Sequence, residues 1–269
     1  AEQIGGEPCF AVSIGGRMGY VDRAGLVVVP PRYDWALDPR NGRGRVALKW
    51  KWGFLDSAGE EVIPLVYDSA GDFSEGLAPV AVDGAWGYVD RQGRVAVPLT
   101  FQYASAFIQG LGRVQSQGKW GYVDGSGDFV IQPNFSDQRI CSPRDGLVAF
   151  CDPPSTSSQD LILEFGEALG QQAWGYMDLR GAVAIAPIYV TADSFYCGLA
   201  KVFTRDDSLG YIDKNGNLKI ALSESSWSFG ERFCEGYAVA GVRNTDTQEP
   251  RFGYIDIHGE YVIPAEFDE

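Results

Sequence analysis

Short apolar runs separated by turn residues recur along the chain, and the segment 77–97 shows the pattern. In its middle run, Trp86 and Tyr88 alternate with Gly87 and Val89. A strand places alternate residues on opposite faces, so one face here is aromatic and the other is aliphatic or bare. A sheet with one solvated face would carry polar residues at alternate positions. The pattern predicts small antiparallel meanders packed between neighbouring sheets, with strands at 77–82, 86–90 and 94–97.

The middle strand repeats seven times as an apolar residue, glycine, an aromatic residue, an aliphatic residue and aspartate. Successive copies are spaced by 34, 34, 34, 54, 35 and 43 residues. A period of about 34 residues indicates one supersecondary unit per copy. The motif glycines are Gly19, Gly53, Gly87, Gly121, Gly175, Gly210 and Gly253.

Each residue type that recurs in the unit has a local structural reason. Aspartate followed three residues later by glycine is typical of a hairpin built on a type I turn. Glycine beside tryptophan predicts close approach of backbone or of a ring from the adjacent module. A proline after the third apolar run, as at Pro98, is expected to close the third strand. The motif tryptophan and tyrosine rings are expected to be core.

The string Trp86-Gly87-Tyr88-Val89-Asp90 with Gly93, repeated seven times, resembles the bacterial WG repeat family. The resemblance covers nearly the whole chain, although Met18, Leu209 and Phe252 replace the tryptophan. It implies a bacterial β-rich repeat protein that mediates interactions, and it implies no catalytic residues.

The predicted fold class is all-β, with residues 1–269 forming a single domain of seven three-stranded meander modules. We expect an open curved array with polar end caps, and the alternative is a closed seven-bladed ring resembling a propeller. Two departures from the period stand out: an insertion at 152–172 between the fourth and fifth motifs, and a smaller one at 244–251.

Composition changes the functional picture. The chain has 36 Asp and Glu against 22 Lys and Arg, a formal charge of −14. That sign argues against nucleic acid and against an anionic membrane surface, and no apolar stretch is long enough for membrane insertion. A basic protein is the expected partner. The Ala1-Glu2-Gln3 start fits a mature secreted protein, which predicts a periplasmic or secreted location, with a cytoplasmic location as the alternative.

The inventory of reactive side chains predicts a protein that is not an enzyme and has no metal or cofactor. The only histidine, His258, occupies a repeat turn where other copies have unrelated residues. The regular carboxylates recur in every unit, as turn caps do and a single catalytic pair does not. Two of the five cysteines, Cys141 and Cys151, flank the segment before the main insertion, and we predict that a disulfide between them braces it.

Binding is expected where a copy deviates from the repeat, because repeated residues build the core. Within the long insertion the candidates are Leu161, Glu164 and Phe165; outside the motif they are Trp35, Trp50 and Trp227, which have no counterparts in other repeats. Trp50 should point away from Trp52, and an exposed tryptophan between lysines is a plausible hot spot. The nearby run of Arg40, Arg43 and Arg45 is typical of a solvated loop.

Two functions fit these observations. The first is a non-enzymatic protein-binding scaffold, in its most concrete form an extracytoplasmic inhibitor or immunity protein against a basic partner. The alternative is a carbohydrate or cell-wall binding protein, because the surplus of aromatic rings could stack on sugars.

Overall fold

The computed structural model describes residues 3–4, 7–56, 58–152, 173–206, 208–222, 231–243 and 249–268. The chain divides into two compact units, unit 1 (Ala1–Asn134) and unit 2 (Phe135–Glu269). Of the predicted insertions, 153–172 and 244–248 lie outside the described residues.

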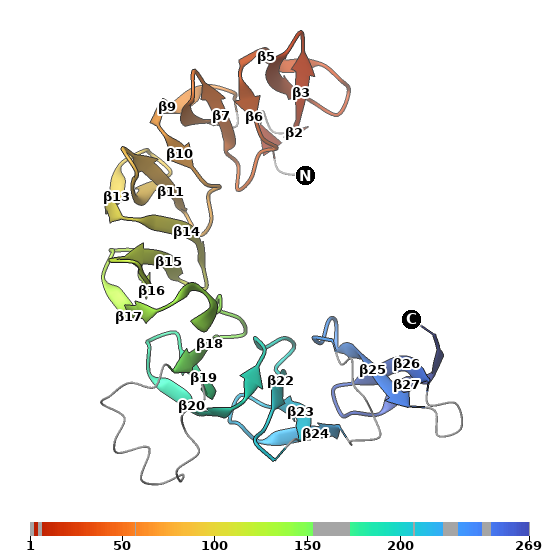
Figure 1. Ribbon diagram of the computed structural model, residues 1–269. Coiled ribbons are helices and arrows are strands. Elements are labelled where there is room, and N and C mark those ends of the chain that lie inside the picture. Colours follow the sequence, from red (N-terminus) through yellow and green to blue (C-terminus); the bar gives the residue numbers. More distant parts are fainter. Residues whose placement is uncertain are drawn as a thin grey trace. The chain divides into compact units, whose positions relative to one another are not determined.

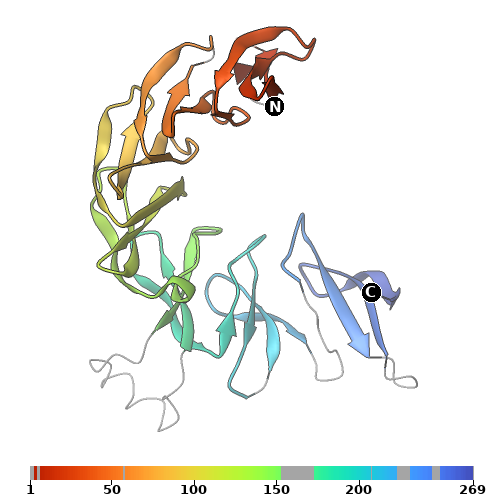
Figure 2. The same cartoon turned by 45° about the horizontal axis from the view of Figure 1, so that its top comes forward.

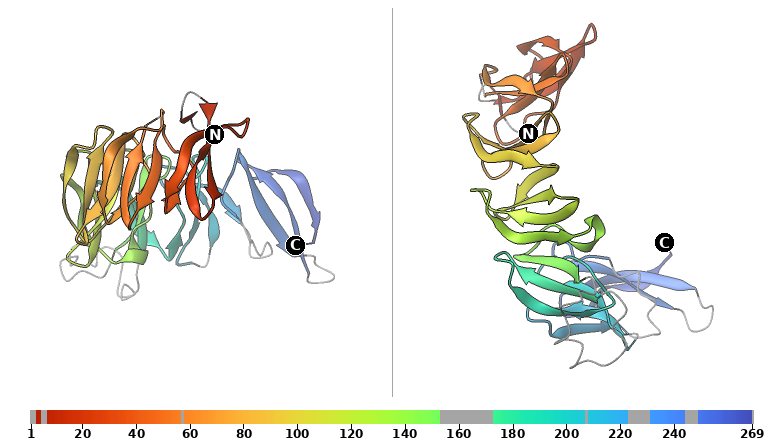
Figure 3. Two further views of the ribbon diagram at one scale, coloured as in Figure 1. Left: turned by 90° about the horizontal axis from the view of Figure 1, so that it is seen from above. Right: turned by 60° about the vertical axis from the view of Figure 1, so that its left-hand side comes forward.

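The described residues form an all-β structure of seven antiparallel sheets, which we number modules 1 to 7, and a short N-terminal hairpin (Figure 1). Within each unit the sheets follow one another in sequence order (Figures 2 and 3). Unit 1 begins with the hairpin of β1 (Gln3–Ile4) and β2 (Glu7–Pro8). Its modules are β3 (Phe10–Ile14), β4 (Arg17–Val21) and β5 (Val27–Tyr33); β6 (Trp35–Ala36), β7 (Gly44–Leu48), β8 (Lys51–Leu55) and β9 (Glu61–Tyr67); β10 (Ser69–Ala70), β11 (Leu77–Val82), β12 (Ala85–Asp90) and β13 (Val95–Phe101); and β14 (Tyr103–Ile108), β15 (Leu111–Ser116), β16 (Lys119–Val123) and β17 (Phe129–Phe135).

Unit 2 holds modules 5 to 7 and one 3₁₀ helix, η1 (Asp137–Arg139). Its modules are β18 (Leu147–Asp152), β19 (Ala173–Asp178) and β20 (Val183–Tyr189); β21 (Thr191–Ala192), β22 (Ala200–Phe203), β23 (Leu209–Ile212) and β24 (Leu218–Leu222); and β25 (Tyr237–Arg243), β26 (Pro250–Asp256) and β27 (Tyr261–Phe267). The all-β class and the seven repeated modules are confirmed. Their arrangement as an open array rather than a ring stays a prediction.

Four of the seven sheets carry a fourth strand that the sequence pattern does not predict. The third strand of one module runs on, after a single residue, as the first strand of the next sheet. Between β5 and β6 that residue is Asp34, and between β13 and β14 it is Gln102. The added strands are mostly two residues long, too short to produce a recognisable alternation in the sequence.

The predicted close approach at the motif glycine is confirmed, but the neighbour is different from the one expected. A Cβ built on Gly87 would lie 2.5 Å from the carbonyl oxygen of Val97 and 2.6 Å from that of Pro98. Both belong to the third strand of the same module, not to an adjacent one. The register between β12 and β13 shifts at this point, so a bulge brings the backbone of the third strand over the glycine.

Pro98 also corrects the expectation that proline ends the third strand. It lies inside β13, which continues to Phe101. Trp86 pairs with Phe101 and Tyr88 with Val97, and the proline falls in the irregular stretch between these pairs. A bulge leaves a backbone N–H without a ladder partner, so proline is tolerated there.

The cores lie between successive sheets, as the apolar character of both strand faces predicts. Tyr88, Val97 and Phe101 of module 3 pack against Phe107 and Val114 of module 4. Equivalent clusters join modules 1 and 2, 2 and 3, 5 and 6, and 6 and 7. Modules 2, 3 and 6 therefore each contribute to two of these cores, one on each face.

Candidate functional site

The hairpins that join the first two long strands of modules 1 to 4 have two-residue turns with positive φ at both positions. This is the type I′ geometry, in which the second position strongly favours glycine. The turn pairs are Gly15-Gly16, Lys49-Trp50, Asp83-Gly84 and Gln117-Gly118. Module 2 is thus the exception, with a tryptophan at the glycine position.

Trp50 has φ of +64° and its side chain is 82% exposed. A bulky residue in the left-handed region is strained, and an exposed ring gains little packing in return. Backbone strain held at an exposed aromatic residue is typical of a position selected for contact with a ligand or partner.

Trp35 lies at the same end of module 2. It is 54% exposed and lies on β6. In the sheet, Trp35 pairs with Ala47 of β7, and Ala47 pairs in turn with Trp52 of β8. The carboxylate of Asp34, next to Trp35, accepts a 2.6 Å hydrogen bond from the backbone N–H of Lys49, next to Trp50. The structure therefore brings together two of the six predicted binding residues.

The motif tryptophans do not lie in the core as expected. Trp52, Trp86 and Trp120 are half-buried, whereas the motif tyrosines of unit 1, Tyr20, Tyr88 and Tyr122, are fully buried. Tyr103, 43% exposed, lies between two of these tryptophans, with ring centroids 5.3 Å from Trp86 and 5.5 Å from Trp120. We use the name aromatic stripe of unit 1 for its exposed and half-buried tryptophans together with Tyr103, namely Trp35, Trp50, Trp52, Trp86, Tyr103 and Trp120.

The repeated aspartates act as turn caps, as predicted. Asp90 accepts hydrogen bonds from the backbone N–H groups of Gln92 and Arg94 at 2.9 and 3.0 Å. The same pair of bonds is made by Asp22, Asp56, Asp124, Asp178, Asp213 and Asp256. His258 supplies one of them through its backbone. Among the described residues, no group of three or more His, Cys, Asp or Glu side chains could hold a metal ion.

A family model described as WG containing repeat matches more than half of the chain, at residues 18–49, 52–84, 86–120, 120–139, 174–206 and 252–269. The chain belongs to the WG-containing repeat family. The sixth copy, around Gly210, falls outside the matched ranges, yet the structure gives it the same sheet of strands β21 to β24.

One of the solved structures that the chain matches shows likeness at the level of the fold. A eukaryotic initiation factor is 11% identical with a TM-score of 0.56, covering 97% of this chain and 74% of the other. The WD40 β-propeller domain of Doa1 is 13% identical with a TM-score of 0.32, covering 87% and 86%. The WD40 domain of SCAP from fission yeast is 11% identical with a TM-score of 0.34, covering 98% and 88%. A search of curated proteins found no match.

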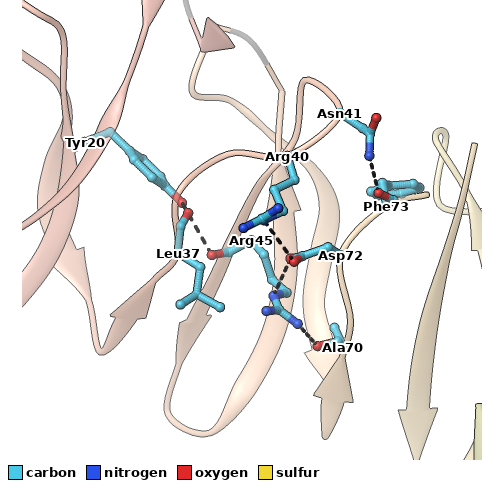
Figure 4. Close-up of polar contacts among 8 residues, drawn as sticks. All are labelled: Tyr20, Leu37, Arg40, Asn41, Arg45, Ala70, Asp72 and Phe73. Carbon is cyan, nitrogen blue, oxygen red and sulfur yellow. Dashed lines mark hydrogen bonds and ion pairs between the residues drawn. The ribbon is translucent and has the colours of Figure 1, made fainter. Parts of the chain in front are cut away.

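The arginine run of WG module 2 makes contacts to the next module that its sequence does not indicate, while the Arg40 side chain stays 70% exposed as expected. Arg40 and Arg45 converge on the carboxylate of Asp72 in module 3, with Nε atoms 3.5 and 3.2 Å from its oxygens (Figure 4). Arg45 also donates to the carbonyl oxygen of Ala70, and Arg43 donates to that of Arg91. These cations therefore join WG modules 2 and 3.

Two cations also face the aromatic stripe. The guanidinium carbon of Arg45 lies 5.4 Å from the ring centroid of Trp52, and that of Arg113 lies 4.1 Å from that of Trp120. Both distances fit cation–π contact. Trp52 and Trp120 are consequently each held by a cation of their own module.

The acidic excess is uneven between the units. Residues 135–269 hold 21 Asp and Glu against 10 Lys and Arg, whereas residues 1–134 hold 15 against 12. Most of the net charge thus belongs to unit 2, whereas the aromatic stripe belongs to unit 1.

The other predicted residues fall in two groups. Leu161, Glu164, Phe165 and Trp227 lie outside the described residues. Cys141 is half-buried and Cys151 is buried. Their two segments lie side by side, because the backbone N–H of Cys141 donates a 2.9 Å hydrogen bond to the carbonyl oxygen of Ala149. The disulfide between them stays a prediction. The described residues include no helix with the length and apolarity needed to cross a membrane.

Proposed function

We propose that this WG-repeat chain is a non-enzymatic protein-binding scaffold whose contact surface is the aromatic stripe of unit 1. The observation that carries the proposal is Trp50, exposed and strained at a turn position that glycine occupies in three sister modules. Tryptophan is enriched among residues that dominate binding energy, and a ring held by a tight turn loses little entropy on binding. The turn-capping role of the regular carboxylates supports a structural rather than catalytic use of these acids.

The proposed partner is a basic protein. The charge excess of unit 2 would speed the encounter with a cationic surface, and salt would weaken that attraction. In its finer form, the proposal is a periplasmic or secreted inhibitor or immunity protein that covers a basic enzyme.

Affinity capture from native lysate tests the proposal. The immobilised chain is compared with Trp50→Gly and with a matched control, Leu26→Ala, which removes an exposed apolar side chain at the opposite hairpin of module 1. We expect one basic protein to bind the chain and the control, to elute at high salt, and to bind Trp50→Gly at least about tenfold more weakly, as for a hot spot. Equal retention by Trp50→Gly would exclude the stripe as the contact surface.

The half-exposed motif tryptophans favour one alternative, a carbohydrate ligand. Rings such as Trp86 and Tyr103, which lie side by side and partly in solvent, could stack on sugar faces. Titration with bacterial cell-wall polysaccharide, followed by tryptophan fluorescence, separates the two functions. A saturable change that is lost in Trp35→Ala and insensitive to salt would favour the sugar ligand over the basic protein.

A further inference from the structure

A cavity of about 750 Å³ lies between modules 5 and 6 of unit 2, beside the motif tryptophan of module 5. Trp174 and Cys141 line it on the module 5 side, and residues 191–194, Tyr196 and Lys201 line it on the module 6 side. A volume of this order is typical of ligand-binding sites. The lining combines aromatic rings with charged groups and hydroxyl groups, so the cavity is suited to a polar ligand with a flat face.

The repeat shows what fills the equivalent space in unit 1. Arg45, Arg113 and Ala149 occupy the same repeat position, each paired with the motif aromatic residue of its own module. In modules 2 and 4 the guanidinium carbons of the two arginines lie 5.4 and 4.1 Å from the ring centroids of the motif tryptophans. Ala149 of module 5 has no side chain beyond Cβ. The space beside Trp174 that a guanidinium group fills in modules 2 and 4 is therefore left to the cavity.

The motif tryptophan of module 3 is covered in another way. Pro79 stands at its arginine position, and the ring of Tyr103, the first residue of β14, lies 5.3 Å from that of Trp86. The residue equivalent to Tyr103 beside module 5 is Thr191, which likewise begins its strand one residue after the preceding one ends. Both side chains that cover motif tryptophans in unit 1 are consequently replaced by small residues around Trp174.

The contacts of Arg45 show which chemistry such a space accepts. Its guanidinium group stacks on the motif tryptophan of module 2, donates to the carbonyl oxygen of Ala70 and pairs with the carboxylate of Asp72 (Figure 4). Ring, carbonyl oxygen and carboxylate together satisfy the flat face, the N–H donors and the charge of a guanidinium group.

The cavity offers the same three groups. Trp174 supplies the ring, and Ala192 stands at the register position of Ala70. Ser194 replaces Asp72, but Asp193 beside it and Glu231 supply carboxylates to the lining.

Motif tyrosines hold the two acidic residues of the cavity in place. The hydroxyl group of Tyr176 donates a 2.7 Å hydrogen bond to the backbone carbonyl oxygen of Asp193, and that of Tyr211 donates a 2.9 Å bond to that of Glu231. The Asp193 carboxylate lies 3.7 Å from Nζ of Lys201 and is still 55% exposed. An acceptor on a backbone fixed in this way costs little entropy when a ligand binds.

The cations of the lining are already engaged. Lys201 faces Asp193, and the guanidinium carbon of Arg232 lies 5.2 Å from the ring centroid of Tyr196. The contact of Arg232 also shows that a guanidinium group stacks on an aromatic ring within this cavity wall.

We propose that this cavity is a binding site for an arginine side chain of a partner protein. The guanidinium group would stack on Trp174, donate to the carbonyl oxygen of Ala192 and pair with Asp193, as Arg45 does within the chain. Arginine suits the site better than lysine, because its planar group stacks and donates in a fixed fork. The excess of acidic residues in unit 2 favours a cation as well. The inference rests on the proposed function only in taking the partner to be a basic protein, and it uses no residue of the aromatic stripe.

Saturation-transfer NMR tests the site with a capped tripeptide, acetyl-Gly-Arg-Gly-amide, added to the full chain up to millimolar concentrations. We expect saturable binding of this peptide. The same peptide with citrulline, which has the shape of arginine without its charge, should bind at least about tenfold more weakly. Because binding is observed on the peptide, the measurement does not depend on tryptophan fluorescence.

Two variants locate the binding in the cavity. Ala149→Arg supplies a guanidinium group from the chain itself, and Trp174→Leu removes the ring; each should weaken binding at least about tenfold. Leucine occupies the tryptophan position in module 6, at Leu209, so the fold accommodates it there. The matched control is Phe252→Leu, which changes the equivalent residue of module 7 and should bind the peptide as the parent does.

Three results would overturn the proposal: no binding of the arginine peptide to the parent chain, equal binding of the citrulline peptide, or unchanged binding by Trp174→Leu. N-acetylglucosamine that binds the parent and not Trp174→Leu, where the arginine peptide does not bind, would make the cavity a sugar site instead. Circular dichroism checks folding, and Trp174→Leu decides if Ala149→Arg is unfolded. The titration uses no partner protein, so its outcome is separate from the lysate capture that tests the aromatic stripe.

Discussion

The hydroxyl group of Tyr88 donates a 2.7 Å hydrogen bond to the backbone carbonyl oxygen of Ser105 in the next module. The ring is fully buried and meets Phe107 edge to face, with centroids 4.8 Å apart. Burial raises the pKa of Tyr88, which keeps the hydroxyl protonated as a donor. The motif tyrosine thus joins modules through packing and through a polar bond at once, and Tyr20, Tyr176 and Tyr211 make the same bond.

Tyr88→Phe removes that bond and retains the ring. We expect the free energy of unfolding to fall by about 1–2 kcal/mol, because the carbonyl oxygen of Ser105 loses its buried donor. Tyr103→Phe, at an exposed ring, should change it by less than about 0.5 kcal/mol. Urea unfolding followed by tryptophan fluorescence measures both variants, and equal stabilities would contradict the bond's contribution.

Gly87→Ala tests the bulge over the motif glycine. Its Cβ would lie 2.5 Å from the carbonyl oxygen of Val97, a backbone atom that cannot swing aside. We expect a loss of at least about 3 kcal/mol, or failure to fold, since the third strand must move. Gly125→Ala is the control, because its nearest neighbour would be a leucine side-chain atom 3.8 Å away. Similar losses in the two variants would show that the bulge yields easily.

The repeat and its strand faces could be predicted from the sequence because both depend on periodicity alone. The alternation places Tyr88 and Trp86 on one face but does not indicate how deeply each ring is buried. The expectation that both rings are core is therefore right for the tyrosine and wrong for the tryptophan. The bulge at Pro98 was also missed, because it depends on a register shift between two strands rather than on either strand by itself.

The candidate site divides in the same way. Trp35 and Trp50 stand out in the sequence because sister modules lack them. Tyr103 gives no such signal, since its place between two tryptophans depends on the one-residue link that leads from β13 into β14. The pairing of Arg45 with Asp72 likewise joins residues from two modules, and neither residue type indicates the partner.

Trp50→Gly should stabilise the fold. Glycine adopts positive φ without steric cost, and the exposed tryptophan gives up few contacts, so we expect the free energy of unfolding to rise by about 1 kcal/mol. The reciprocal change, Gly84→Trp in the equivalent turn of module 3, should lower it by a similar amount. Thermal unfolding compares the two variants. Destabilisation by Trp50→Gly would mean that the ring stabilises its own module by packing on it and is not free to contact a partner.

The turn aspartates should make stability fall in acid. Burial alone would raise the pKa of Asp213, but hydrogen bonds from Asn217 and Asn215 outweigh it and lower the pKa to about 2. Hydrogen bonds from the backbone of Ala182 and Arg180 similarly lower the pKa of Asp178. A folded pKa below the unfolded value of about 3.9 gives stability that is present above that value and is lost as pH falls toward 2.

Asp213→Asn isolates one of these groups, because the amide can still accept the turn bonds and does not titrate. We expect its thermal midpoint to fall less than that of the parent between pH 4 and pH 2. Scanning calorimetry at matched ionic strength measures the difference. Parallel curves for parent and variant over that interval would show that Asp213 contributes nothing to the acid transition.

Glu75→Gln tests how the loops of adjacent modules are joined. The two carboxylate oxygens of Glu75 accept hydrogen bonds from the backbone N–H groups of Gln109 and Gly110, both at 2.7 Å. The glutamine amide has one acceptor oxygen, and its NH₂ group would face the second N–H, so we expect a loss of about 2 kcal/mol. Glu61→Gln makes the same chemical change on the exposed start of β9 and should be nearly neutral. Urea unfolding of both variants separates the lost bond from the lost charge, because an effect of the net charge alone would be similar in the two variants and would disappear in high salt.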